Sequence, residues 1–315
     1  MVSRSRDHGG RDDATNDARE RVARYGGWLL TPTDPAYPER LTELRDPPGR
    51  LYGLGGLDAA EPPAVAIVGT RRATPYGLRV ARAIAGACAR AGASVVSGLA
   101  AGVDGAAHEA ALAAGGRTVA VLGTGFDSVY PRGHRALQER IAREGLLLSE
   151  LAPGQPGHGG TFPRRNRIIA ALADVTIVVE AGEGSGALIT ADVALELGRR
   201  IGCVPNAIDV PSARGSNALL KAGAEPVLSP EDVLAMLALR AEPTPPPRLD
   251  GDAASCWDAI CRGAMDLHAV TSLSGLSARA VSVAITALEI EGLLSVDATG
   301  AIRPAVELST VHGGH

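Results

Sequence analysis

Between residues 64 and 239 the chain alternates short apolar runs with alanine-rich stretches of helical character, and this alternation constrains its fold more than any other feature. The apolar runs cover residues 65–68, 94–97, 118–122, 146–149, 175–179, 202–204 and 226–228. The helices are expected at residues 75–91, 104–114, 133–143, 166–172, 187–199, 216–222 and 230–239. Strands that are apolar throughout and alternate with helices are typical of a parallel sheet covered on both faces. We therefore predict an α/β core with a doubly wound, mostly parallel sheet over residues 63–241.

The segments that flank this core differ from it in composition. Residues 1–25 are charged and contain several glycines, so we predict that they are disordered. Residues 26–62 are punctuated by proline and glycine and are expected to form a short N-terminal lead-in, with one helix near residues 39–44, that packs on the core. Residues 242–252, EPTPPPRLDGD, are expected to form a proline-rich linker.

Residues 253–310 are predicted to form a small C-terminal winged-helix domain. Its helices are expected at residues 255–261, 267–271 and 278–291, followed by a short hairpin. The last helix, with the sequence SARAVSVAITALEIE, contains one arginine and two glutamates. Helices that enter the major groove normally carry several basic or amide side chains, so sequence-specific duplex binding is not well supported. A protein-contact role for this domain is at least as well supported.

The charge and the aromatic content limit the kind of ligand that the chain can bind. The formal net charge is −4, but residues 62–235 carry 17 basic and 15 acidic side chains. Any anion site should therefore lie in this middle segment and should be local. Aromatic residues make up only 3 % of the chain, which argues against a broad platform that stacks many bases.

The cysteine pattern and the hydropathy indicate a cellular compartment. The four cysteines include no C-x-x-C pair and have no histidine at metal-ligand spacing, so we expect a reducing compartment, no disulfide framework and no bound metal. The chain has no run of about 18 apolar residues, and its first residues lack the apolar segment of a secretory signal. We therefore expect a cytoplasmic protein without membrane association.

Glycine-rich segments follow four of the predicted strands. The candidate phosphate-binding residues in them are Gly69, Thr70, Arg71, Arg72, Ser97, Gly98, Gly123, Thr124, Gly184, Ser185 and Gly186. Because the carboxyl ends of parallel strands meet at one edge of a sheet, these loops should form a common rim beside helix N-termini, which favour anions. A tight turn with solvated arginines would explain the first of these loops equally well. The complete G-x-G-x-x-G pattern and the Walker A pattern are absent, so we expect no nicotinamide or ATP cofactor.

The segment Thr161–Arg167, TFPRRNR, contains one of the two phenylalanines of the chain and three arginines. The candidate contacts to single-stranded nucleic acid are Phe162, Arg164, Arg165, Asn166 and Arg167. Arginines can reach phosphates and Phe162 can stack on a base, while Asn166 could cap the helix that continues IIAALA. The alternative is a solvated basic helix start with the phenylalanine in the core. Arginines near a helix N-terminus oppose the helix dipole, which disfavours this purely structural interpretation.

Evidence for catalysis in the sequence is weak. Asp104 and His108 lie four residues apart on one predicted helix, but no third ligand stands at recognisable spacing. Glu180 ends a buried run beside a glycine-rich loop and could bind a sugar hydroxyl. No Ser-His-Asp or Cys-His arrangement is found, so we assign no catalytic residue and expect a protein that is not an enzyme.

Five segments of the chain together resemble one known family. VAIVGTRRATPYG, VVSGLAAGVDGAAHEAAL, FPRRNRIIAALADVTIVVEAG, GSGALITADVALELGR and RGSNALLKAGAEPV are similar to DNA-processing protein A, also called Smf, over about residues 28–240. The resemblance implies a Rossmann-like core that binds single-stranded DNA, protects it and loads RecA on it, in some bacteria during natural transformation. It also implies a homodimer formed through the core and an optional winged-helix tail.

The resemblance extends to individual positions. The phosphate-binding Gly-Ser-Arg loop of the family matches Gly69-Thr70-Arg71, which keeps the hydroxyl. The F-P-x-R-N-R segment of the family matches Phe162 to Arg167, and its G-S-G-[AS]-L-I-T loop matches Gly184 to Thr190. Asn206 replaces a usual glycine, Ser216 replaces a usual threonine, and the N-terminal helical domain of many members is short or missing. With about three to four phosphates neutralised, binding should be largely independent of sequence, with a logarithmic salt slope near −2 to −3.

Two other functions are compatible with parts of the sequence. The LOG-type nucleoside monophosphate phosphoribohydrolases also use a glycine-rich strand end, but their P-G-G-x-G-T-x-x-E pattern is not intact in GEGSGALIT. Alternatively, the chain could be an adaptor whose acidic tail recruits a protein partner, with DNA binding incidental. Release of free base from AMP would support the first function, and loss of partner binding after deletion of residues 242–315 would support the second.

Overall fold

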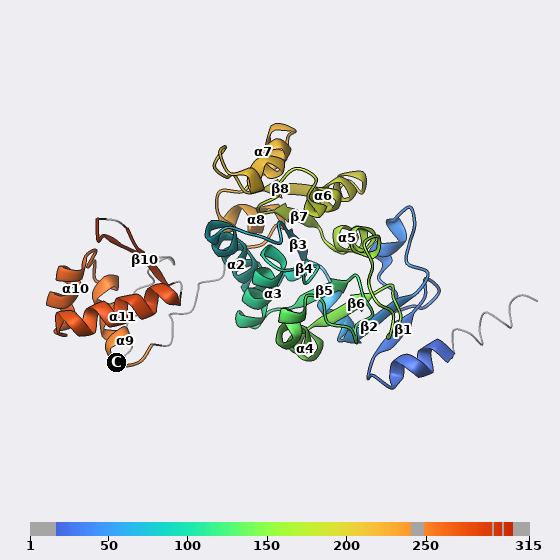
Figure 1. Ribbon diagram of the computed structural model, residues 1–315, viewed down its shortest axis with the longest axis horizontal. Helices are drawn as coiled ribbons and strands as arrows, with labels where there is room; N and C mark the ends of the chain where they lie inside the picture. The colour runs from blue at the N-terminus through green and yellow to red at the C-terminus, as the bar shows by residue number, and fades with distance from the viewer. Residues whose placement is uncertain (1–16, 241–248, 292, 298, 305–315) are drawn as a thin grey trace, which may run out of the picture. The chain divides into compact units, whose positions relative to one another are not determined.

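The computed structural model describes residues 17–240, 249–291, 293–297 and 299–304 of the chain (Figure 1). The chain divides into two compact units, residues 1–241 and residues 242–315. In the first unit a nine-stranded sheet lies between two layers of helices. In the second, three helices pack beside a two-stranded sheet.

The nine strands of the first unit are short, and most of them are buried. They are β1 (Trp28–Leu30), β2 (Leu51–Gly55), β3 (Ala64–Val68), β4 (Ser94–Ser97), β5 (Thr118–Leu122), β6 (Leu146–Ser149), β7 (Val175–Val178), β8 (Arg200–Cys203) and β9 (Glu225–Pro226). Their order in the sheet is β1-β2-β6-β5-β4-β3-β7-β8-β9. The seven strands from β6 to β9 are parallel, whereas β1 and β2 pair antiparallel at one edge.

The helices of the first unit connect these strands. They are η1 (Glu39–Glu43), η2 (Leu57–Ala60), α2 (Pro75–Arg90), α3 (Val103–Ala113), η3 (Arg132–His134), α4 (Arg135–Glu144), α5 (Thr161–Leu172), α6 (Gly186–Glu196), η4 (Pro211–Ala213), α7 (Arg214–Lys221) and α8 (Pro230–Met236). Alternate residues of β3 show why both faces of the sheet are covered. Val65 and Ile67 pack with α2, α3 and α8, whereas Ala66 and Val68 pack with η1, α5 and α6. The predicted doubly wound, Rossmann-like α/β class is confirmed.

The order of the strands places a switch point beside β3. From β3 the chain continues to β4, β5 and β6 on one side, and then returns to β7, β8 and β9 on the other side. The loops after β3 and β7 therefore leave the sheet in opposite directions and open a crevice between them. In open α/β sheets this crevice, outside the carboxyl ends of the strands, is where ligands bind.

The strands and helices expected from the sequence are all present, but the bounds of several helices differ from the prediction by three to five residues, and one of these differences affects the site. Each predicted strand lies within two residues of its observed position. Helix α5 begins at Thr161 rather than at residue 166, so Asn166 lies inside the helix and does not cap it. Gly160 is the residue that precedes the helix, and Pro163 lies in its first turn, where the missing N–H of proline costs nothing.

The N-terminal segments are also more ordered than expected. Within the segment 1–25, residues 17–23 form a helix whose Ala18 and Val22 are buried against Leu29 and other apolar residues of the core, and residues 1–16 lie outside the described residues. The lead-in 26–62 supplies β1 and β2, so it belongs to the sheet itself. Tyr52 of β2 stands opposite Ser149 of β6 in this register.

The second unit contains α9 (Gly251–Cys261), α10 (Leu267–Ser274), α11 (Ala278–Ile290), β10 (Leu294–Val296) and β11 (Ile302–Pro304). Trp257, Ile260, Val270 and Ile285 belong to its buried core. Gly275, with φ +71°, ends α10 in the left-handed conformation, and Ser277 caps α11 through its side chain. Helix, helix-turn-helix and a terminal hairpin match the predicted winged-helix domain.

Among the described residues no single helix is long and apolar enough to cross a membrane, and only the bent pair α10–α11 together reaches that length and composition.

Candidate functional site

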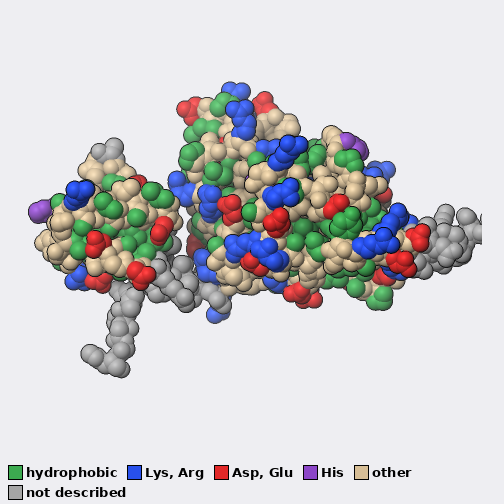
Figure 2. All heavy atoms as spheres, turned by 60° about the horizontal axis from the view of Figure 1, so that its bottom comes forward, with side chains coloured by type: hydrophobic (Ala, Val, Ile, Leu, Met, Phe, Trp, Pro, Cys, Tyr) green, Lys and Arg blue, Asp and Glu red, His purple; other side chains and the backbone are tan. Residues whose placement is uncertain are grey.

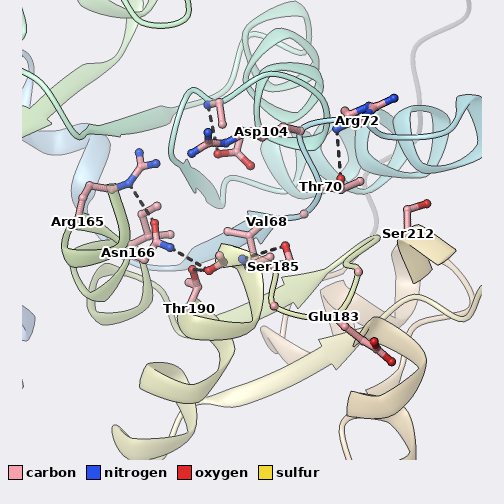
Figure 3. A pocket seen from close by; sticks show the side chains of 18 residues that line it. Val68, Thr70, Arg72, Asp104, Arg165, Asn166, Glu183, Ser185, Thr190 and Ser212 are labelled. Atoms are coloured by element: carbon pink, nitrogen blue, oxygen red, sulfur yellow. Dashed lines mark hydrogen bonds between the residues drawn. The ribbon is translucent and has the colours of Figure 1, made fainter. Parts of the chain in front are cut away.

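A cavity of about 400 Å³ opens at the switch point (Figure 3). Its walls are the loop after β3, the loop from β7 into α6, and the first turns of α5. Among the predicted site residues it is lined by Gly69, Thr70, Arg71, Arg72, Arg165, Asn166, Gly184, Ser185 and Gly186. The structure thus brings together residues that are more than 110 positions apart in the sequence. We call this space the switch-point cavity.

The loop after β3 is held close to the sheet edge by its glycine. A Cβ atom on Gly69 would lie 2.5 Å from Cγ2 of Val103 and 2.9 Å from the carbonyl oxygen of Glu180. The N–H of Thr70 donates to the same Glu180 carbonyl over 2.6 Å. Because this contact leaves no space for a side chain at position 69, the loop presents its backbone and the Thr70 hydroxyl to the cavity.

The N-terminus of α6 forms the opposite wall. Ser185 caps this helix, and its Oγ accepts from the N–H of Ala187 over 3.3 Å. Asn166 of α5 donates from Nδ2 to the carbonyl oxygen of Gly186 over 2.9 Å, which fixes α6 against α5. The N-terminus of a helix carries a partial positive charge, so this wall favours an anion in the cavity.

Arg165 forms the cationic floor of the cavity. Only 6 % of it is exposed, and its Nη1 donates to the carbonyl oxygen of Gly98 over 2.6 Å and also to that of Val121. Burial lowers the pKa of Arg165 to about 10, and the Asp104 carboxylate opposes that shift. The side chain is therefore still charged at neutral pH. Gly98 is required beside it, because a Cβ atom there would collide with the guanidinium group.

Asp104 also lines the cavity, and it fixes the loop of residues 98–100 that Arg165 contacts. Its Oδ2 accepts from the N–H of Gly98 over 3.1 Å and from that of Ala100 over 3.3 Å. Burial raises the pKa of Asp104, while Arg165 and these two N–H groups act in the opposite direction. His108, the other weak catalytic candidate, instead contacts Thr118, and burial lowers its pKa to about 3. The two side chains do not form an acid–base pair.

An aromatic and cationic cluster lies at the rim of the cavity, where Arg71 lines the cavity and two aromatic rings stand just outside its lining residues. The ring of Phe162 lies 4.9 Å from that of Tyr130 between centroids, at an angle of 43°. The guanidinium carbon of the exposed Arg71 lies 5.7 Å from the centroid of the Phe162 ring. Tyr130 is 48 % exposed and was missed in the sequence, where a tyrosine among five carries no distinguishing signal. At this rim the rings of Phe162 and Tyr130 offer a surface on which a base can stack, and Arg71 beside them offers a cation that can bind a phosphate.

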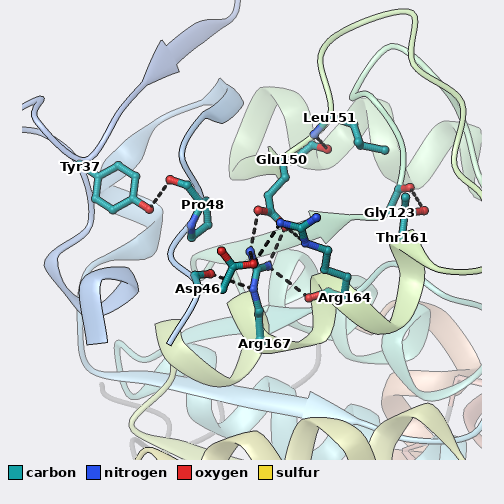
Figure 4. Close-up of polar contacts among 10 residues, drawn as sticks. Tyr37, Asp46, Pro48, Gly123, Glu150, Leu151, Thr161, Arg164 and Arg167 are labelled. Atoms are coloured by element: carbon teal, nitrogen blue, oxygen red, sulfur yellow. Dashed lines mark hydrogen bonds and ion pairs between the residues drawn. The ribbon is translucent and has the colours of Figure 1, made fainter. Parts of the chain in front are cut away.

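Two of the three arginines in α5, Arg164 and Arg167, do not line the switch-point cavity and instead reach Asp46 and Glu150 (Figure 4). Arg167 is 13 % exposed and donates from Nη1 and Nη2 to the two carboxylate oxygens of Glu150, each over 2.6 Å. Its Nε donates to the carbonyl oxygen of Asp46 over 3.1 Å, and Arg164 pairs with the Asp46 carboxylate, also over 3.1 Å. The predicted phosphate contact of Arg167 is therefore not supported, because a bidentate carboxylate already satisfies its guanidinium group.

The remaining predicted residues support the site without lining the switch-point cavity. Ser97 is fully buried and donates from Oγ to the carbonyl oxygen of Ile67 over 2.7 Å, and Thr124 donates to that of Ser128 over 3.3 Å. Gly123 lies under the Phe162 ring, where a Cβ atom would be 2.6 Å from Cδ1. Their side chains are used inside the fold, so direct contact of Ser97 and Thr124 with a ligand is not supported.

The charge of the site is local, as expected. Figure 2 shows basic and acidic side chains interspersed over the face of the core that it presents, without a wide surface of one sign. The switch-point cavity itself is lined by Arg71, Arg72 and Arg165 against Asp104 and Glu183. Within the described part of the chain, no three histidine, cysteine, aspartate or glutamate side chains are grouped so that they could hold a metal ion.

Known proteins match this chain over both of its units. The family described as DNA recombination-mediator protein A matches residues 28–238, and the DprA winged helix domain matches residues 240–297. Protein Smf of Synechocystis is 50 % identical over 213 residues, which are 66 % of this chain and 54 % of that protein. The chain thus spans about half the length of that relative. A putative DNA processing protein DprA of Mycobacterium tuberculosis is 39 % identical over 303 residues, 89 % of this chain and 78 % of its own.

Two solved structures share the fold of the core. DNA processing protein A of Streptococcus pneumoniae is 41 % identical, with a TM-score of 0.63 over 66 % of this chain and 73 % of its own. The protein of the same name from Helicobacter pylori, whose structure is described for its single-stranded DNA binding mode, is 34 % identical, with a TM-score of 0.60 over 67 % and 95 %. The chain therefore belongs to the DNA recombination-mediator protein A family, as its sequence motifs predicted, and it carries the winged-helix domain of that family.

Proposed function

We propose that this protein binds single-stranded DNA at the carboxyl edge of its sheet, with the sugar–phosphate chain in the switch-point cavity and one or a few bases against Phe162 and Tyr130. The observation that carries the proposal is the combination of Arg71, Arg165 and the α6 N-terminus in one cavity with an aromatic pair at its rim. Backbone N–H groups and arginines suit phosphates, and ring faces suit unstacked bases. A base inside a duplex could not reach these rings.

The binding would be non-catalytic. Glu180, the carboxylate at the end of β7, is fully buried; it accepts from Thr74 over 2.8 Å and from the Ser212 hydroxyl. It is therefore not free to act on a sugar, so the carboxylate that the sequence offered for a nucleotide phosphoribohydrolase does not support that alternative.

The further steps of the proposal rest on the family to which the chain belongs. The bound strand would be protected from nucleases and delivered to RecA for recombination, in the cytoplasm, by a homodimer of the core. In a transformable host the strand would be incoming DNA. A protein that holds the strand by its phosphates suits this task, because phosphate contacts carry no sequence information.

Single-stranded and duplex oligonucleotides of one sequence distinguish this function from its alternatives. We expect fluorescence anisotropy to show clear preference for the single strand, with a logarithmic salt slope of about −2 to −3, since roughly three to four phosphates are neutralised. Equal affinity for duplex, or release of free base from AMP, would contradict the proposal. Deletion of residues 242–315 should leave this preference unchanged, because the site lies wholly in the core.

A further inference from the structure

A second hollow, of about 310 Å³, adjoins the switch-point cavity and shares Arg71 and Arg72 with it. Its other walls are α2, α3 and η3, which contribute Arg82, Glu109 and His134. We call it the α2–α3 hollow. No sequence motif pointed to it, because its charged residues come from three elements that are separated by about 25 residues each.

The α2–α3 hollow is cationic, and its cations are only weakly engaged. Three arginines and His134 face one carboxylate, that of Glu109. Arg82 is paired with Glu109 over 3.6 Å, and the two side chains are 51 % and 55 % exposed. Such an exposed pair contributes little stability, so a phosphate can compete for Arg82 at small cost. Arg167, held by Glu150 in two bonds of 2.6 Å, is the contrasting case.

His134 is held in place by the fold. Its Nδ1 lies 3.1 Å from the carbonyl oxygen of Leu99, so this nitrogen carries a proton and donates. Its ring packs on Gly105, where a Cβ atom would be 2.7 Å from Cε1. Leu99 itself has φ +56°, a strained conformation for leucine, and Asp104 fixes the loop around it. The ring is thus fixed at the wall of the hollow.

The loop 98–100 joins the two cavities. Its Gly98 carbonyl accepts from Arg165 in the switch-point cavity, and its Leu99 carbonyl accepts from His134 in the hollow. Arg165 of the first space and His134 of the second are therefore both held by the loop 98–100, and Arg71 and Arg72 line both spaces. A single strand that leaves the first space over these two arginines enters the second.

We propose that the α2–α3 hollow binds a further phosphate of the same DNA strand, through Arg82 and His134, and so lengthens the site beyond the switch-point cavity. This inference rests on the proposed function. It makes affinity depend on strand length: short oligonucleotides occupy the first space alone, and longer ones fill both. Single-strand sites on the small OB-fold domain take about 4 to 16 nucleotides, and we therefore look for the change within that range.

The test compares affinity with oligothymidylate length, from about 4 to about 16 nucleotides, for wild type, Arg82→Ala and His134→Gln. We expect both variants to match wild type on the shortest strands and to bind the longest about three- to fivefold more weakly, with a salt slope reduced by about 0.7 for Arg82→Ala. Arg79→Ala is the matched control, because Arg79 is exposed on the same helix, stacks on Tyr76 and does not line the hollow.

The outcomes separate this inference from the function on which it rests. If Arg71→Ala weakens binding at all lengths but Arg82→Ala and His134→Gln follow wild type throughout, the inference is wrong and the switch-point site stands. If Arg71→Ala has no effect either, the proposed function itself fails. Thermal unfolding of each variant checks that the fold is intact. Arg82 is half exposed, so Arg82→Ala should fold normally and tests the inference by itself if His134→Gln unfolds.

Discussion

Replacing Arg71 by alanine should weaken binding of single-stranded DNA by about tenfold to a hundredfold without changing the stability of the fold. Arg71 is exposed, lines the switch-point cavity and lies 5.7 Å from the Phe162 ring centroid. A hydrogen bond to a charged partner is worth about 1.5–3 kcal/mol, which corresponds to that range of affinity. The same change should reduce the magnitude of the salt slope by about 0.7, since one phosphate contact is lost.

Arg79→Ala provides a close control for this variant. Arg79 also lies 5.7 Å over an aromatic ring, that of Tyr76, and is also exposed, but it does not line the switch-point cavity. Its replacement removes one positive charge and one cation–π contact, and we expect the affinity to change less than twofold. Equal losses in the two variants would mean that binding depends on diffuse charge and that the cavity is not the site.

Replacing Arg165 by alanine should lower the free energy of unfolding by about 3–5 kcal/mol, the cost of breaking a buried charge arrangement. The variant leaves the carbonyl oxygens of Gly98 and Val121 without their donor and the buried Asp104 carboxylate without its nearby cation. Urea unfolding measures the loss. Because Asp104 then lacks compensation, Asp104→Asn should cost less stability in the Arg165→Ala background than in wild type.

Arg167→Ala is the comparison for Arg165, from the same helix. It breaks the bidentate pair with Glu150, but Arg164 lies 3.8 Å from that carboxylate and can compensate for it. We expect a smaller loss of about 1–2 kcal/mol and unchanged affinity for single-stranded DNA in the folded protein. A large loss of affinity in Arg167→Ala with an intact fold would show that the strand takes a different path, along the Glu150 side of α5.

The three arginines of α5 show what could be predicted from the sequence and what could not. Their presence beside Phe162 marked the segment as functional, but with the helix predicted to start at residue 166 they were treated as equivalent. Since the helix starts at Thr161 and turns about 100° per residue, Arg164 and Arg167 share one face and Arg165 points to another. The proline in the first turn was the signal that could have placed this boundary.

The edge of the sheet was predictable for a different reason. Parallel strands place their carboxyl ends together whatever their order, so the glycine-rich loops could be assigned to one rim before the topology was known. Which loops meet across the switch point depends on the strand order, and this follows from pairings that are distant in the sequence. β1 was missed because a strand of three residues has no period to detect, and β2 was missed because its partner β6 lies more than ninety residues later in the chain.

The path of the strand itself is the central claim, and crosslinking with peptide mapping tests it most directly. Oligothymidylate crosslinked to the 315-residue chain by ultraviolet light should attach to the peptides that contain Tyr130 and Phe162, because these rings lie at the rim of the switch-point cavity. The adducts should disappear in competition with unlabelled single strand and persist with duplex. Adducts confined to residues 249–304, with none on these two peptides, would contradict the account and assign DNA binding to the winged-helix unit.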